Sequence, residues 1–246
     1  MNQPSARPSH PIVRSPATPS ELLTHILAHL RHPTTILICW PKSVFLAALV
    51  QDPKPNGPQH QGHILLHDSL LQRAISRHLR LAFIPSVAHL RAYLTTFSTT
   101  DPGSKTSPPP PPPTTTTSRS SSRGSSPHRP ALLVYGLLEL HRDGSEWSAQ
   151  GLGVSGAALV EAAARSSLRP VVVEPRGAMG YDALDEFLDQ EMPILSGDVS
   201  DADGPAFRRR SVPVRRVLGR WFEFEESMAE ADQDGGEMTR ESGPEG

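Results

Sequence analysis

Residues 98–130 form a segment that cannot contribute to a folded core. The segment contains the six consecutive prolines Pro108 to Pro113, then four threonines and a tract rich in serine and arginine. This composition buries too little apolar surface to offset the entropy of ordering the chain, and consecutive prolines favour an extended polyproline II conformation. We therefore expect residues 98–130 to be disordered, whatever the rest of the chain forms.

The two ends of the sequence are also poor in apolar residues. Residues 1–19 are polar and rich in proline, and residues 226–246 carry mostly acidic charges. We expect a disordered N-terminus and a disordered acidic tail. Residues 20–225 then make one domain that is interrupted by the disordered insertion 98–130, and its length suits a single domain of ordinary size.

The two blocks beside the insertion alternate between helical and extended patterns. Residues 21–31 repeat apolar side chains at the helical period, with Thr18 or Ser20 available as the N-cap. Short apolar runs that indicate buried strands occur at residues 34–40, 79–84, 131–135 and 171–173. Helical patterns occur between them, from Ser43, over residues 64–78, from Val87 and over residues 154–165.

Apolar strands separated by helices are typical of a parallel sheet that is covered on both faces. Residues 192–195 and 211–224 show no helical pattern between their extended runs, so we expect them to form an antiparallel extension. The predicted fold class is α/β, with a three-layer, mostly parallel sheet and C-terminal antiparallel strands.

Charge and cysteine content exclude several classes of protein. The 24 Lys and Arg residues nearly balance the 26 Asp and Glu residues, so the net charge of −2 does not indicate a polyanionic partner. Cys39 is the single cysteine, which excludes a disulfide framework and fits a reducing compartment. No apolar run approaches the ~18 residues of a membrane span. We expect no membrane partner and a location in the nucleus or cytoplasm, with the nucleus preferred.

Motifs for phosphate binding and nucleophilic catalysis are weak. Gly103-Ser104-Lys105-Thr106 lacks a glycine directly before the lysine and follows no strand, so it is a poor phosphate loop. Residues 153–157 loosely resemble a nucleophile elbow around Ser155, but no strand directly precedes them, and close backbone packing explains their small side chains better. We expect Cys39 to be an inert core thiol, since it lies in a predicted buried strand.

Two sets of histidines have helical spacing. They are His25, His29 and His32 in one set, and His60, His63 and His67 in the other. Either set could bind one metal ion, but metal sites normally also use carboxylates or cysteine, and few such residues lie near these histidines. We interpret these histidines as surface residues and expect no metal ion or other cofactor.

The strongest local charge feature is a stretch rich in arginine near the C-terminal end. It contains Arg208, Arg209, Arg210, Arg215, Arg216 and Arg220, followed by Trp221 and Phe222. A solvated face is the ordinary interpretation of such a stretch. Arginines interleaved with aromatic residues also suit phosphate contact and base stacking, and a nuclear-import signal is a further alternative.

Residues 131–174 resemble the region around the Walker B strand of RecA-like recombinases and their paralogues. The resemblance rests on the apolar strand Leu132–Val134, Leu140-His141-Arg142, the segment Glu146–Leu152, a helix to Arg165 and the strand Val171–Val173. Residues 34–49 and 79–97 resemble the strand–helix units that follow the phosphate-loop helix in that family.

Two departures from the family pattern remove the nucleotide-binding elements. The Walker B aspartate is replaced by Tyr135 or Gly136, depending on the alignment, and neither residue can hold Mg²⁺. The segment that would carry the phosphate loop is absent, because only the predicted helix 21–31 precedes the first predicted strand. The resemblance therefore implies a pseudo-ATPase, similar to the recombinase paralogues of the Shu complex or to the RecA-like ring subunits of Elongator.

The resemblance also implies partners. It implies a non-catalytic subunit that pairs with another RecA-like subunit and supports homologous recombination and DNA repair by binding DNA or a recombinase. The candidate DNA contacts are Arg176, in the loop after the strand 171–173, and Arg208, Arg209, Arg210, Arg215 and Arg216. One alternative is a scaffold subunit of the Elongator type in tRNA modification. Another is a small α/β hydrolase, which would need a histidine and a carboxylate beside Ser155 or Cys39.

Overall fold

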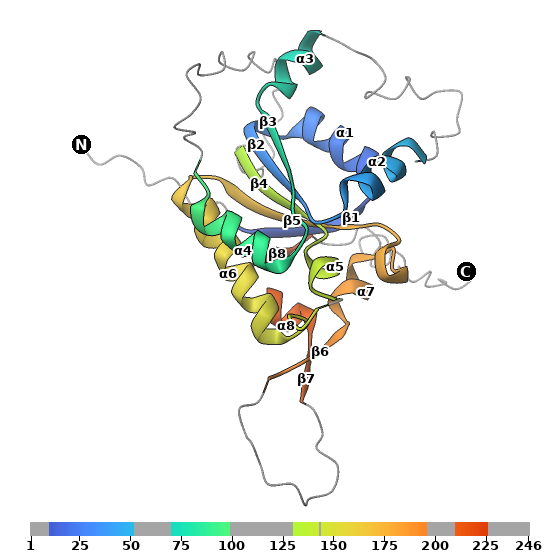
Figure 1. The fold of residues 1–246 in the computed structure, drawn as a ribbon, viewed down its shortest axis with the longest axis vertical. Coiled ribbons are helices and arrows are strands. Elements are labelled where there is room, and N and C mark those ends of the chain that lie inside the picture. The colour runs from blue at the N-terminus through green and yellow to red at the C-terminus, as the bar shows by residue number, and fades with distance from the viewer. Residues whose placement is uncertain (1–9, 52–69, 99–129, 143, 196–209, 226–246) are drawn as a thin grey trace, which may run out of the picture.

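The computed structural model describes residues 10–51, 70–98, 130–142, 144–195 and 210–225 (Figure 1). Except for its two end residues, the predicted insertion 98–130 lies outside these ranges, as does the predicted acidic tail 226–246. The described residues form an α/β fold in three layers, in which helices flank a parallel sheet. The predicted fold class is thereby confirmed, and the arrangement is compatible with a RecA-like fold.

The main sheet contains six parallel strands in the order β3-β2-β4-β5-β1-β8. Their bounds are β1 (Ile12–Ala17), β2 (Arg31–Ile38), β3 (Leu79–Phe83), β4 (Pro130–Tyr135), β5 (Arg169–Pro175) and β8 (Glu223–Phe224). Since β2 pairs with both β3 and β4, the chain before residue 99 and the chain after residue 129 belong to the same sheet.

Strand β1 corrects the prediction that all of residues 1–19 are disordered. It lies inside the sheet, with β5 on one side and β8 on the other. Val13 is only 1% exposed, whereas Arg14 and Ser15 give the strand its polar sequence. Pro16 falls where the register with β5 shifts, between Arg14 and Ala17, a position that tolerates a missing backbone N–H.

Helices cover both faces of the sheet (Figure 1). One face carries α1 (Pro19–His29) and α2 (Lys42–Gln51), and α3 (Leu70–Ser76) leads into β3. The other face carries α4 (Val87–Thr96), α5 (Leu137–Arg142), α6 (Ala149–Arg165), α7 (Leu184–Leu188) and α8 (Val214–Leu218), with a 3₁₀ turn at Ala178–Gly180. Each face has its own cluster of buried apolar side chains, so the sheet separates two cores.

The C-terminal part of the fold matches the predicted antiparallel extension only at its start. β6 (Glu191–Pro193) and β7 (Ser211–Pro213) pair in antiparallel fashion as a small separate sheet. The rest of residues 211–224 does not continue it, because α8 follows β7 directly and β8 runs parallel to β1. Val214, Val217 and Leu218 are buried at helical spacing, which is the packing that favours α8.

Helix α6 begins at Ala149, earlier than the predicted start at residue 154, because Ser148 caps it by accepting a hydrogen bond from Gly151 N (3.0 Å). A side chain at Gly151 would have no space, since an added Cβ would lie 2.3 Å from the carbonyl oxygen of Glu146. An added Cβ at Gly153, on the same helix, would meet only Val217 at 4.0 Å.

These two glycines give a matched pair of stability variants. We expect Gly151→Ala to lower the free energy of unfolding by about 1–3 kcal/mol, because the turn at Glu146 must move. Gly153→Ala should leave the free energy of unfolding unchanged or raise it by up to about 1 kcal/mol, through helix propensity. Urea unfolding of the full chain measures both. Equal destabilisation by the two variants would contradict the packing of this turn.

Candidate functional site

The junction between β1 and α1 is the place where a phosphate-binding α/β domain keeps its glycine-rich loop. Here β1 ends at Ala17 and α1 begins at Pro19, so Thr18 alone connects them. The Thr18 side chain accepts from Glu21 N, and Glu21 Oε2 accepts from Thr18 N at 3.0 Å. Glu21 therefore places a carboxylate at the helix N-terminus, where a phosphate would otherwise bind.

This geometry refines the interpretation that the phosphate-loop segment is absent. The strand that precedes the helix is present as β1, and it is the loop that is reduced to one residue. No stretch of backbone N–H groups between Ala17 and Pro19 remains to cradle a phosphate.

Tyr135, the last residue of β4, stands at one of the two positions predicted for the missing Walker B aspartate. Its side chain is fully buried, and its hydroxyl donates a hydrogen bond to the carbonyl oxygen of Ala17 (2.9 Å). The ring makes edge-to-face contacts with Trp40 and Phe45, at centroid distances of 5.7 and 5.9 Å. Gly136, the other aligned position, has a φ of +83°. An aromatic cluster thus fills the space at the carboxyl ends of the strands, from β4 across to β1.

Glu174 lies near the carboxyl end of β5 and is the buried carboxyl group of this part of the sheet. It is fully buried, and its Oε1 accepts a hydrogen bond from Leu138 N at 3.0 Å. Its Oε2 has no partner within the described part of the chain. Burial raises the pKa of Glu174 to about 8, so the group is largely neutral at pH 7 and is a poor ligand for a cation.

Cys39 lies just after β2 and is buried in the core, as the sequence predicted. Burial, together with the nearby carboxyl groups of Glu174 and Glu139, raises the pKa of the Cys39 thiol well above its usual range. A thiol that stays protonated is a weak nucleophile. The geometry around Cys39 therefore gives no support to a cysteine-dependent hydrolase.

Ser155 of α6 does contact a histidine. The Ser155 hydroxyl lies 3.0 Å from Nε2 of His141, and Nδ1 of His141 lies 2.8 Å from the carbonyl oxygen of Leu137. Nδ1 must therefore carry the proton, so Ser155 donates its hydroxyl hydrogen to Nε2. Arg91 Nε in turn donates to Ser155 at 3.1 Å. Every group in this chain of hydrogen bonds has a partner.

The Ser155–His141 pair lacks the features of a catalytic site. Both side chains are completely buried, and burial lowers the pKa of His141, which keeps the ring neutral. A backbone carbonyl, rather than a carboxylate, contacts Nδ1. The nearby carboxylate of Glu146 binds Arg91 instead (2.7 Å). These residues form a structural bridge between α4, α5 and α6, and the geometry does not favour the hydrolase alternative.

Two of the six candidate arginines are engaged by the protein itself. Arg176, which follows β5, forms an ion pair with Glu21 (2.8 Å). Arg215 of α8 forms ion pairs with Asp185 and Asp189, and these hydrogen bonds raise the pKa of its guanidinium group. Both side chains are held in place, and a phosphate group would have to compete with their carboxylate partners.

The other candidate arginines differ in what the structure describes. Arg210 and Arg216 are exposed, and neither forms an ion pair with another described residue. Arg208 and Arg209 lie outside the described residues. Arg216 borders a groove of about 590 Å³ between α6, β7 and α8, which also includes Arg220 and Trp221. We call it the α8 groove. The sequence indicated its arginines but not its apolar wall on α6.

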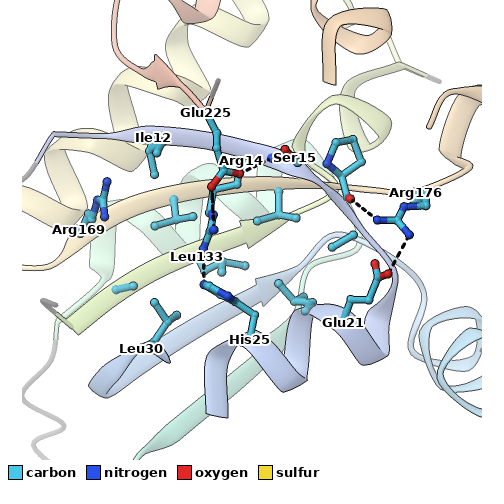
Figure 2. Close-up of a pocket in the computed structure, with 16 residues that line it drawn as sticks. Ile12, Arg14, Ser15, Glu21, His25, Leu30, Leu133, Arg169, Arg176 and Glu225 are labelled. Atoms are coloured by element: carbon cyan, nitrogen blue, oxygen red, sulfur yellow. Dashed lines mark hydrogen bonds and ion pairs between the residues drawn. The ribbon is translucent and has the colours of Figure 1, made fainter. Parts of the chain in front are cut away.

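A second groove lies on the opposite face of the sheet, beside α1 (Figure 2). It has a volume of about 670 Å³, and we call it the β1 groove because β1 supplies one wall. Its apolar floor includes Ile12, Leu133 and Val171, and its charged rim includes Arg14, Arg169, Arg176, Glu21 and Glu225. The sequence did not indicate this groove, because its β1 wall comes from residues predicted to be disordered.

The histidines predicted at helical spacing are not assembled into a metal site among the described residues. His25 contacts Arg14 at the wall of the β1 groove (Figure 2). The side chains of His29 and His32, and residues His60, His63 and His67, lie outside the described part of the structure. No group of three or more His, Cys, Asp or Glu side chains that could hold a metal ion is found in the described ranges.

None of the helices in the described ranges is both long and apolar enough to cross a membrane. Comparisons with protein-family models, curated proteins and solved structures give no match.

Glu174 makes the stability of the fold depend on pH. Its pKa of about 8 in the folded chain lies above the ordinary value of 4.5, so the folded state holds a proton that the unfolded state loses. Stability therefore falls as the pH rises from 4.5 towards 8, by about 2 kcal/mol between pH 6 and pH 8. We expect Glu174→Gln to remove this loss, as measured by urea unfolding at both pH values. An equally steep loss in the variant would contradict a neutral Glu174.

Proposed function

We propose that this chain is a non-catalytic RecA-like subunit that assembles with another RecA-like protein and supports homologous recombination by binding DNA or a recombinase. The observation that carries the non-catalytic part is the β1–α1 junction, where Thr18 stands in place of a loop and Glu21 caps the helix. Phosphoryl transfer requires a cradle for the phosphates and a carboxylate that orients Mg²⁺. Neither element is found at the end of β1 or at Tyr135.

The DNA-binding part of the proposal is supported by the α8 groove. Arg216 and Arg220 line it and are exposed, and the neighbouring Trp221 is 39% exposed. Arg210 is also exposed and directly precedes Ser211, which lines the groove. Guanidinium groups contact phosphates, while an accessible indole offers a stacking surface for an unpaired base. This combination favours single-stranded DNA over a duplex. Arg215 contributes indirectly, because its ion pairs with α7 and the residue that follows it hold α8 in place.

The absence of ATPase activity is the first expectation. Purified full-length protein should not hydrolyse ATP above the background rate in the presence of Mg²⁺, and labelled ATP should show no saturable binding. A catalytically active RecA-like ATPase, assayed in parallel, is the positive control. Hydrolysis at the rate of that control would contradict the proposal outright.

The DNA contacts give a second expectation. In the full chain with its partner subunit, Arg210→Gln combined with Arg216→Gln should weaken binding to a labelled single-stranded oligonucleotide. The slope of log affinity against log salt should become shallower by about 0.7 for each phosphate contact that the substitutions remove. Arg77→Gln removes an exposed arginine before β3, at the other edge of the sheet, and is the matched control. An unchanged affinity and slope in the double variant would place the DNA contacts elsewhere.

Copurification separates this proposal from the Elongator alternative. The full chain, captured from cells and analysed by mass spectrometry, should bring down a RecA-like recombination protein. Recovery of Elongator subunits instead would favour the scaffold role in tRNA modification.

A further inference from the structure

Two apolar side chains that line the α8 groove are accessible to a ligand. Trp221 is 39% exposed, and Val154 of α6 is 54% exposed. Gly153 and Ala157 line the groove as well, and their small size leaves open space along α6. A groove of about 590 Å³ with these walls has room for a flat group of the size of a nucleobase.

The position of the Trp221 indole is fixed by α6 and α8. An added Cβ at Gly156 would lie 3.3 Å from Cδ1 of Trp221, so the ring packs closely against the α6 backbone. The backbone N–H of Trp221 donates to the carbonyl oxygen of Leu218 at the end of α8 (2.8 Å). Because the ring is already held in place, a base that stacks on it orders little that was free before.

The charge of the groove selects an anion. Arg216 and Arg220 line it and are exposed, and neither forms an ion pair with another described residue. No aspartate or glutamate is among the described residues that line the groove. A nucleic acid strand supplies both phosphates for the arginines and an aromatic ring for the indole, whereas an acidic protein segment supplies only the charge.

The groove has little that could distinguish one base from another. Gln150 carries the amide that could read the edge of adenine, but its Oε1 accepts from Leu195 N and its Nε2 donates to Leu195 O, both at 3.0 Å. The hydroxyl of Ser211, which also lines the groove, can pair with any base. Stacking tolerates every base, since each has an aromatic face.

We propose that the α8 groove binds one unpaired base of a DNA strand by stacking on Trp221, beside Val154, and does not select among the four bases. Arg216 and Arg220 would contact the phosphates on either side of that base. A duplex cannot bind in this way, because its bases are already paired and stacked on one another. The inference rests on the proposed function, in which DNA is the ligand, and adds which part of the strand the groove recognises.

The probes are five fluorescein-labelled DNA decamers, titrated into the full chain and followed by fluorescence anisotropy. One consists of abasic nucleotides alone, and each of the others carries a single central adenine, cytosine, guanine or thymine. We expect each decamer with a base to bind about tenfold more tightly than the abasic one, because only the base can stack. The four should differ among themselves by less than about fivefold, since a base-specific hydrogen-bonded contact would give a larger difference.

Substitutions in the groove test the assigned side chains. Trp221→Ala should remove the advantage of the decamers that carry a base, and Trp221→Phe should restore most of it, because a phenyl ring also stacks. Val154→Asp should weaken binding of all five decamers by about threefold or more, since it places a carboxylate in the groove. Val50→Asp is the matched control, because Val50 is 84% exposed on α2, on the other face of the sheet (Figure 1), and it should leave the affinities unchanged.

Equal binding of the abasic decamer and of the decamers with a base would overturn this proposal and leave the phosphate contacts of the proposed function in place. So would an advantage of the base that persists in Trp221→Ala, or a preference for one base of about tenfold or more. Binding of none of the five decamers to the full chain would overturn the proposal together with the DNA-binding part of the proposed function. The two failures are therefore distinguishable.

Discussion

The pairing of β1 with β5 is the constraint on which the rest of the structure depends. It places Ile12 opposite Val171 and Val13 opposite Val172, which puts the N-terminal strand inside the sheet and gives β8 an edge to join. It also fixes the position of Ala17, whose carbonyl oxygen accepts a hydrogen bond from the Tyr135 hydroxyl. The aromatic cluster at the carboxyl ends of the strands and the β1 groove both follow from this one parallel pairing.

The carboxyl ends of parallel strands are where open α/β sheets ordinarily bind ligands. In this chain, buried side chains fill the carboxyl ends of the strands. Tyr135 spans from β4 to the end of β1, and Glu174 is kept neutral by burial rather than charged for metal binding. Glu21 supplies the negative charge at the start of α1 that a phosphate would supply elsewhere. Two grooves among the described residues lie on the faces of the sheet instead.

How well the sequence predicted each element follows from how its residues are buried. β4 and β5 were found because both are covered on two faces and are apolar throughout. β1 was missed because Arg14, Ser15 and Pro16 interrupt its few apolar side chains. The short helices α5, α7 and α8 span only one or two turns, too little for a periodic pattern to be recognised. Their helical state depends on packing with distant elements, which local sequence does not encode.

The candidate arginines could not be ranked from the sequence, because the residues that pair with them lie far away along the chain. Arg215 and Arg216 are neighbours in the chain, yet one is bound by two carboxylates at α7, and the other is exposed on the α8 groove. The pairing depends on residues far away in the sequence, at Asp185 and Asp189. Arg169, which no sequence pattern singled out, borders a groove on the opposite face. The net charge of −2 thus conceals two grooves that have arginines at their rims and lie on opposite faces of the sheet.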